Sequence, residues 1–276
     1  MDLNKDNLKK IRQKKAFVFD IEGVLCDEID NGRALPSAVE FVKNLRKVDK
    51  KVTVLSNISR KPRAIVFSRL KEMGFPLSEN DVFTAGAATA SYVRRKHPNA
   101  RCFVISEWGL RTDLEKQGIT LANEGDADVV LMGVDRRVSY SELNHAARLV
   151  MNGARLICVG TTMMFKGTFL GESGMFLGEA PFANAISMAT NAPITYIGKP
   201  YPEIFLQTIT NLGAKPKDAI MLGDNLSSDI KGARAAGIDS VFITKGMKFE
   251  SKVLKEEEQP TFVARDLKEL NNVMFE

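Results

Sequence analysis

Two acidic side chains near the N-terminus are the first residues whose type and spacing could do chemistry. Asp20 follows the apolar run 16–19, and Glu22 stands two positions later, just before Gly23. Because alternate residues of a strand share a face, both carboxylates would point to one side of a sheet. The carboxyl end of a buried parallel strand is where open α/β folds bind ligands. Taken alone, the pair is most simply a solvated strand end, so its meaning depends on what else lies there.

Polar groups follow two further apolar runs. Ser56 and Asn57 come after residues 52–55, and they offer a hydroxyl and an amide that can donate to a phosphoryl oxygen. Both residue types also favour turns and helix caps. Lys199 follows the apolar run 194–197, where its charge could neutralise a phosphate or a carboxylate. In isolation this side chain would be interpreted as a surface lysine.

Two more carboxylates follow a fourth apolar run. Asp224 follows residues 220–222 after one intervening glycine, and Asp229 lies five positions later, in the first turns of an expected helix. The helix dipole would explain an acidic residue at Asp229 but explains Asp224 poorly. Mg²⁺ prefers carboxylate and carbonyl oxygens and keeps some of its waters. Asp20, the backbone carbonyl of Glu22 and Asp224 would supply such a set.

Hydrophobic periodicity predicts that an α/β fold with a parallel sheet positions these groups. Short apolar runs alternate with amphipathic helical segments from residue 16 to residue 92, and the alternation returns from residue 194 onward. Strand–helix–strand units of this kind have right-handed crossovers. The intervening stretch repeats the pattern, with strands expected at 102–105, 128–132 and 156–159, and an irregular glycine-rich loop expected at 160–178.

Composition places the chain among soluble globular proteins. Its 276 residues allow one large core or two unequal domains. No apolar run approaches the roughly 20 residues that cross a bilayer, so we expect no membrane association. The N-terminal segment lacks the apolar core of a secretory signal. Cys26, Cys102 and Cys158 lack zinc-type spacing and predict reduced thiols in a cytoplasmic protein.

Charge and aromatic placement predict no nucleic-acid partner. The net charge of +5 is modest, and the basic cluster at 9–15 has no interleaved aromatics, so a solvated segment is the simpler interpretation. A mild positive excess would also suit an anionic substrate. Trp108 opens an expected helix and is interpreted as a packing residue rather than as a base-stacking platform.

In their order along the chain, the four strand ends resemble the four motifs of the haloacid dehalogenase (HAD) superfamily. The motifs are Asp-x-acid-Gly-Val-Leu at 20–25, Ser-Asn at 56–57, Lys-Pro at 199–200 and Gly-Asp-Asn-x-x-x-Asp at 223–229. The long insert is similar to the α/β cap of the NagD and p-nitrophenylphosphatase group, through residues 83–90, 130–136 and 198–205. The resemblance implies a Rossmann-like parallel sheet core with the HAD fold at 1–86 and 190–276, and a smaller inserted α/β cap domain at 87–189.

The resemblance implies a Mg²⁺-dependent phosphatase of a small phosphorylated metabolite, either a sugar phosphate or a nucleotide. Asp20 would be the nucleophile that becomes an aspartyl-phosphate, and Glu22 would be the acid and base. The other roles implied are phosphate binding by Ser56, Asn57 and Lys199, and metal binding by Asp20, Glu22, Asp224 and Asp229. Similar proteins include cap-to-cap dimers, and the sequence leaves monomer and homodimer open.

Two departures from the family pattern support an alternative function. The position of Glu22 is usually aspartate, and the added methylene moves the carboxyl group that exchanges the proton. The cap segment at 160–165 reads Gly-Thr-Thr-Met-Met-Phe where relatives often carry an Asn-Pro-Asp type sequence. The alternative is a HAD-like protein that binds or senses a phosphorylated ligand with little turnover.

Overall fold

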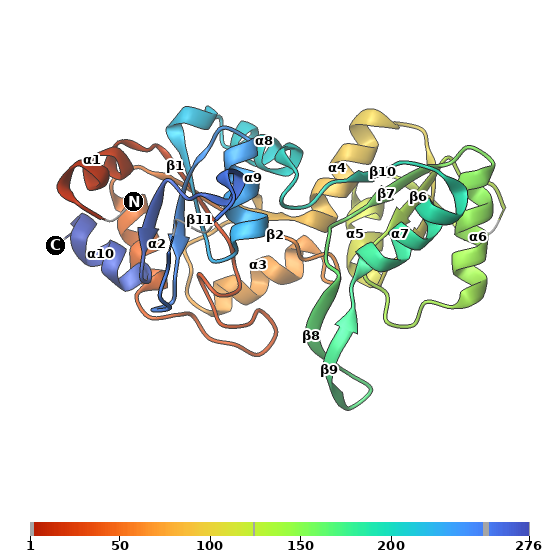
Figure 1. Cartoon of the computed structure of the whole chain (residues 1–276), viewed down its shortest axis with the longest axis horizontal. Helices are drawn as coiled ribbons and strands as arrows, with labels where there is room; N and C mark the ends of the chain where they lie inside the picture. The colour runs from red at the N-terminus through yellow and green to blue at the C-terminus, as the bar shows by residue number, and fades with distance from the viewer. Residues whose placement is uncertain (1–2, 124, 251–253, 276) are drawn as a thin grey trace. The chain divides into compact units, whose positions relative to one another are not determined.

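The computed structural model describes residues 3–123, 125–250 and 254–275, and the chain forms two compact units (Figure 1). The first unit comprises Met1–Ser56, Ala64–Phe83 and Lys199–Glu276, and the second comprises Asn57–Arg63 and Thr84–Gly198. Compared with the expected bounds at 86/87 and 189/190, residues 57–63, 84–86 and 190–198 belong to the second unit.

The first unit is built on a six-stranded sheet with the order β13-β12-β11-β1-β2-β3. Neighbouring strands from β13 to β2 are parallel, and Phe19 at the end of β1 stands opposite Val54 and Leu222. Both faces of β1 and β11 are buried, which explains why these strands are apolar at every position. The strands are β1 Ala16–Phe19, β2 Lys51–Ser56, β3 Val82–Thr84, β11 Ala219–Gly223, β12 Asp239–Ile243 and β13 Phe262–Ala264.

Helices of the first unit pack in pairs around this sheet. Phe19 meets Phe41 of α2 edge to face, and Phe41 meets Phe275 of α10, each with ring centroids 6.0 Å apart. A second pair consists of α8 and α9, which pack against each other. The helices are α1 Lys5–Gln13, α2 Ala38–Lys47, α3 Arg63–Glu72, α8 Pro202–Asn211, α9 Lys231–Ala235 and α10 Leu267–Phe275, with shorter turns η1 Glu79–Asp81, η2 Pro216–Asp218, η3 Leu226–Ile230 and η5 Glu256–Glu258.

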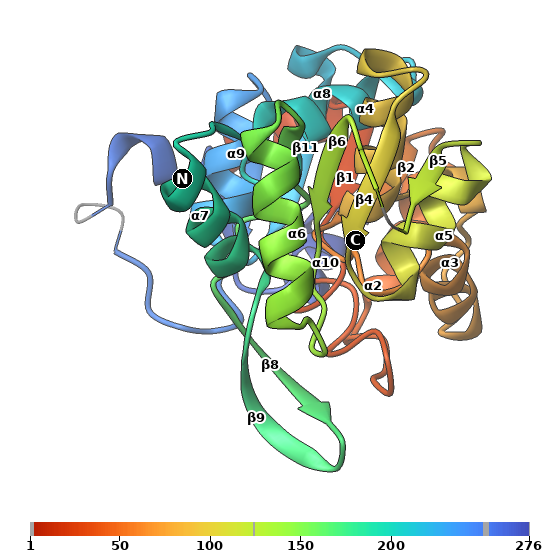
Figure 2. The ribbon, with the colours of Figure 1, turned by 90° about the vertical axis from the view of Figure 1, so that its right-hand side faces the viewer.

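The second unit has its own five-stranded parallel sheet with the order β10-β7-β6-β4-β5. Helices α6 and α7 lie side by side (Figure 2), and α4 packs against α5. Its elements are α4 Ala85–Lys96, β4 Arg101–Ile105, α5 Trp108–Lys116, β5 Thr120–Ala122, β6 Val129–Met132, α6 Tyr140–Met151, β7 Arg155–Cys158, α7 Glu179–Thr190 and β10 Ile194–Tyr196. The sequence assigned β10 to the first unit, and this was wrong because β10 pairs with β7.

The segment at 160–178 is not the irregular loop that its glycines indicated. It contains an antiparallel hairpin of β8 Met164–Phe169 and β9 Glu172–Leu177. Leu170 and Gly171 join the strands and both have positive φ, at 52° and 86°, as a two-residue hairpin turn of the right twist requires. Gly167 and Gly174 stand opposite each other in the ladder.

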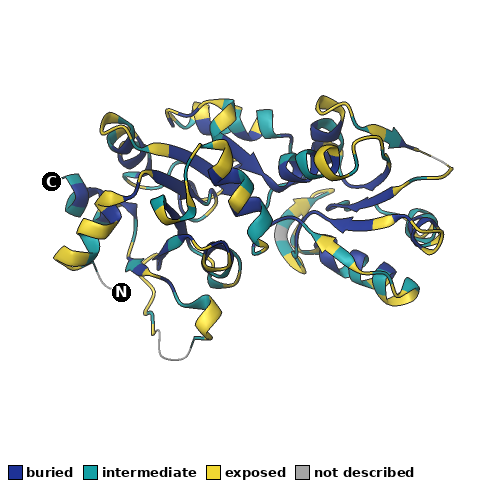
Figure 3. Cartoon of the chain, turned by 90° about the horizontal axis from the view of Figure 1, so that it is seen from above, coloured by how far each residue is buried: buried dark blue, intermediate teal, exposed yellow. Residues whose placement is uncertain are grey.

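The buried residues are concentrated in and around the two sheets. Figure 3 shows buried residues concentrated in the strands, while the helices present exposed residues outward. Cys26, Cys102 and Cys158 are buried free thiols, and burial raises the pKa of Cys26 and Cys102 to about 12. None of the described helices is both long enough and apolar enough to cross a bilayer.

Candidate active site

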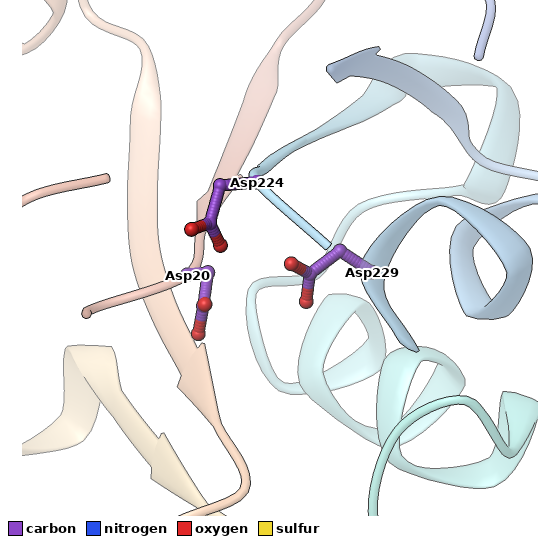
Figure 4. A group of neighbouring side chains, drawn as sticks. All are labelled: Asp20, Asp224 and Asp229. Atoms are coloured by element: carbon purple, nitrogen blue, oxygen red, sulfur yellow. The ribbon is translucent and has the colours of Figure 1, made fainter. Parts of the chain in front are cut away.

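Three carboxylates meet at the carboxyl edge of the first unit's sheet. Asp20 follows β1 directly, and its N–H donates to the carbonyl of Leu222, 2.9 Å away. Asp224 follows β11 directly, and Asp229 lies within η3. One carboxylate oxygen from each residue lies within 4.8 Å of the others, and the side chains converge (Figure 4). The parallel register of β1 and β11 therefore brings together acids that are about 200 positions apart in sequence.

Lys199 joins two of these carboxylates from within the protein. Its Nζ lies 2.7 Å from Oδ1 of Asp20 and 2.6 Å from Oδ1 of Asp229, and it donates to the carbonyl of Leu55 at 3.2 Å. The Lys199 side chain is 3% exposed and that of Asp229 is fully buried. A buried lysine with two carboxylate partners is fixed in place rather than free in solvent.

The pKa values of Asp20, Asp229 and Lys199 reflect their burial and the attraction between the lysine and the two carboxylates. Burial raises the pKa of Asp229 to about 7, although Lys199 acts in the opposite direction. Burial also raises the pKa of Asp20 above its usual range, again against Lys199. For Lys199 itself, burial would lower the pKa, but Asp20 and Asp229 together outweigh it and hold the pKa above its ordinary value. A hard cation among these oxygens would complete the charge balance, so the cluster fits a divalent metal such as Mg²⁺.

A second lysine, which sequence reasoning missed, contacts the third carboxylate. Nζ of Lys245 lies 2.6 Å from Oδ2 of Asp224, and the lysine side chain is 46% exposed. Lys245 follows β12 by two residues and has a φ of 55°, in the left-handed region. The sequence feature that could have identified Lys245 is its position after an apolar run, and the same feature identified Asp20 and Lys199.

Two glycines are required by the close approach of backbone to these acids. A Cβ at Gly23 would lie 2.2 Å from Oδ2 of Asp224, and Gly23 also has a φ of +86°. A Cβ at Gly223 would lie 2.3 Å from the Cβ of Asp229. Asn225 then caps η3, with its Oδ1 accepting from the N–H of Ser227 and of Ser228. These local requirements explain why the segment 223–229 can fold back over the strand end.

The carboxylate of Glu22 has a different environment. Its side chain is exposed, and Oε1 accepts a hydrogen bond from the N–H of Ile29 at 3.0 Å. Among the residues that the structure describes, Glu22 is not part of the group formed by Asp20, Asp224 and Asp229. The structure therefore brings together Asp20, Lys199, Asp224 and Asp229, and directs the Glu22 side chain toward the loop that follows β1.

The remaining candidates stand at the end of β2. Ser56 is the last residue of the strand and is buried. Asn57 is the next residue in the chain and belongs to the second unit. Their proposed contacts with a phosphoryl group stay predictions.

Comparison with known proteins gives matches along most of the chain. A model of haloacid dehalogenase-like hydrolases matches residues 17–120, and a model of HAD-hydrolase-like proteins matches residues 196–270. The acid sugar phosphatase of Staphylococcus epidermidis is 28% identical over 260 residues, which cover 93% of this chain and 96% of that protein. A 5'-nucleotidase of Bacillus subtilis is 28% identical over 258 residues, which cover 92% and 96%.

The fold is also similar to that of solved structures. A double mutant of the thermostable NPPase from Geobacillus stearothermophilus superposes with a TM-score of 0.82 at 30% identity. The match covers 93% of this chain and 97% of that one.

Proposed function

We propose, from the premise that this chain belongs to the haloacid dehalogenase superfamily and its NagD and p-nitrophenylphosphatase group, that the protein hydrolyses phosphate monoesters. The observation that carries this proposal is the buried Lys199 between Asp20 and Asp229, with Asp224 beside them. A protein that only binds its ligand has no need of a carboxylate that is oriented by a lysine and aimed at the sheet edge.

In this proposal Asp20 is the nucleophile. One of its oxygens forms a bond to phosphorus as the bond to the leaving alcohol breaks, and a water molecule then hydrolyses the aspartyl-phosphate. Lys199 stabilises the charge on the transferring phosphoryl group, and Asp229 fixes the lysine in position through the 2.6 Å ion pair. Ser56 and the backbone N–H of Asn57 donate to the remaining phosphoryl oxygens.

The acidic cluster suits a divalent cation, for which we propose Mg²⁺. Asp20, Asp224, Asp229 and the backbone carbonyl of Glu22 would hold it, and its charge would lower the repulsion between the carboxylates and an anionic substrate. Lys245 already neutralises part of the charge on Asp224.

We assign the role of acid and base in this reaction to Glu22. Its carboxyl group would protonate the leaving alcohol and then activate water. Oε1 accepts from the N–H of Ile29, so Oε2 would have to exchange the proton from the position that this hydrogen bond sets. A proton donor misplaced by about 1 Å costs on the order of a hundredfold in rate. The hydrogen bond to Ile29 thus favours a second candidate, a phospho-ligand sensor with little turnover.

The relatives and the charge of the chain support our proposal for the substrate class. The names of the similar proteins cover an acid sugar phosphatase and a 5'-nucleotidase, so we propose a small sugar phosphate or nucleotide. The chain carries a formal charge of +5, which suits an anionic substrate.

Release of p-nitrophenol from p-nitrophenyl phosphate tests the proposal directly. We expect turnover that requires Mg²⁺, is lost with EDTA and is abolished in Asp20→Asn. The matched control is Asp126→Asn, which removes an exposed carboxylate outside the cluster and should keep full activity. Absence of turnover at millimolar substrate with Mg²⁺ would refute the phosphatase and leave the sensor.

A further inference from the structure

An open pocket of about 390 Å³ lies within the second unit, apart from the residues assigned to catalysis. Two of its lining residues follow β4 and three follow β6, and β4 and β6 are neighbours in the sheet. Its lining residues are Glu107, Trp108, Asp135, Arg136, Arg137 and Phe169. The pocket therefore stands at the carboxyl edge of a parallel sheet.

The strand order makes this point of the edge a binding position by topology. From β4 the chain continues through α5 to β5 on one side, and from β6 it continues through α6 to β7 on the other side. Adjacent parallel strands whose connections leave in opposite directions form a topological switch point, and open α/β sheets bind ligands in the crevice there. The second unit thus has a site of its own at β4 and β6.

One wall of the pocket is rigid before any ligand arrives. Nε of Arg136 donates to Oε1 of Glu107 at 2.6 Å, and Nη2 donates to Oε2 at 3.0 Å. Nη1 of Arg136 donates to the carbonyl of Thr168 at 2.8 Å, and the guanidinium lies 4.7 Å from the ring centroid of Phe169. Arg136 and Glu107 satisfy each other, so neither is the group that awaits a ligand.

Two other lining side chains remain available. Trp108 is 54% exposed, which is more than its interpretation as a packing residue predicts. The Arg137 guanidinium lies 5.5 Å from the Phe169 ring, and among the described residues it has no hydrogen-bond acceptor. Asp135 accepts from the backbone N–H of Arg137 through its Oδ1. An exposed indole beside an unpaired guanidinium suits a flat ring that carries an acceptor.

We propose that this pocket binds a nucleobase with a carbonyl oxygen, stacked on Trp108 while Arg137 donates to the base. Arginine pairs well with adjacent oxygen and nitrogen acceptors on one purine edge, whereas the amino group of adenine offers a donor at the same place. A hypoxanthine or guanine ring is therefore preferred over adenine. As a statement about substrate class this rests on the proposed function, because a nucleotide would supply such a base.

Trp108 is the only tryptophan of the chain, so its fluorescence reports on this pocket alone. Inosine is the probe, because it carries the base without a phosphate and tests the pocket independently of catalysis. We expect saturable quenching by inosine, weaker quenching by adenosine, and none by ribose 5-phosphate. In Arg137→Gln the dissociation constant for inosine should rise about tenfold, the usual discrimination from one such pair.

The control variant is Arg155→Gln, which changes an exposed arginine at the opposite, amino end of β7 and should bind inosine unchanged. Arg137 is exposed, so its variant should fold, as circular dichroism would verify. Equal quenching by ribose 5-phosphate, or an unchanged dissociation constant in Arg137→Gln, would overturn the proposal.

Steady-state kinetics tests the substrate class separately. The wild-type protein should hydrolyse inosine monophosphate, and Arg137→Gln should leave kcat and KM for ribose 5-phosphate unchanged. Saturable inosine binding without any phosphatase activity would refute the proposed function while supporting the pocket. Phosphatase activity without inosine binding would refute the pocket while supporting the proposed function.

Discussion

Replacing Lys199 by methionine is the sharpest test of the charge arrangement at the first unit's sheet edge. The substitution keeps the length of the side chain and removes the cation that contacts Asp20 and Asp229. Because Asp229 is fully buried, its carboxylate would then lack a charged partner in a low-dielectric environment. Breaking a buried ion pair from one side costs about 3–5 kcal/mol, and we expect a loss of this size at pH 8.

The loss should depend on pH with a definite sign. The pKa of Asp229 in the folded protein is about 7 and its ordinary value is 3.8, so the folded state binds the extra proton between these limits. A raised carboxyl pKa means that stability increases as pH falls through the folded value. Below pH 7 Asp229 becomes neutral in the wild-type protein too, so the lysine contributes less. The stability difference between Lys199→Met and wild type should therefore shrink from pH 8 to pH 6.

Urea unfolding at pH 8 and pH 6, with EDTA to exclude divalent cations, measures both values. The double variant Lys199→Met/Asp229→Asn removes the buried charge along with its partner, and it should recover at least half of the loss at pH 8. The reasoning would be refuted by an equal loss at both pH values, or by a double variant as unstable as the single one.

Three further variants address the neighbouring residues. Lys245→Ala removes the cation beside Asp224, so Mg²⁺ should bind roughly two- to fivefold tighter by calorimetry, as expected from an exposed ion pair; weaker binding would contradict this. Glu22→Asp loses the reach to the N–H of Ile29, so kcat on p-nitrophenyl phosphate should rise, by up to about a hundredfold; an unchanged kcat would show that the extra methylene is not limiting. Gly23→Ala places a Cβ 2.2 Å from Oδ2 of Asp224 at a φ of +86°, so urea unfolding should show a loss of at least about 1–3 kcal/mol, and wild-type stability would refute the steric argument.

The part of the site that sequence reasoning predicted depends on one geometric rule. Parallel strands end at a common edge, so Asp20, Lys199 and Asp224 come together although the chain separates them widely. The same rule would have found Lys245 after β12. Thr244 separates it from the strand, and the lysine reaches back to Asp224 through its long side chain, a contact that the sequence pattern alone does not reveal.

The errors have a different physical origin. An apolar run shows that a segment is a strand but does not show which sheet it joins, and β10 accordingly pairs with β7 in the second unit. Glycines at 167, 171 and 174 suggested a loop, whereas they serve the ladder and the turn of the β8–β9 hairpin. Whether Trp108 is covered depends on its neighbours in space, which spacing along the chain does not reveal.

The direction of Glu22 follows from where β1 ends. Residues two apart share a face only within a strand, and β1 stops at Phe19, so the alternation that was expected to align Glu22 with Asp20 no longer applies. The longer glutamate side chain reaches the N–H of Ile29, and Arg69 holds the same loop through the carbonyls of Ile29 and Asp30. The loop therefore sets the position of the second acid, while the sheet sets that of the first. Any catalytic role of Glu22 must use the position that this hydrogen bond sets, so it is the part of the mechanism that depends on the loop.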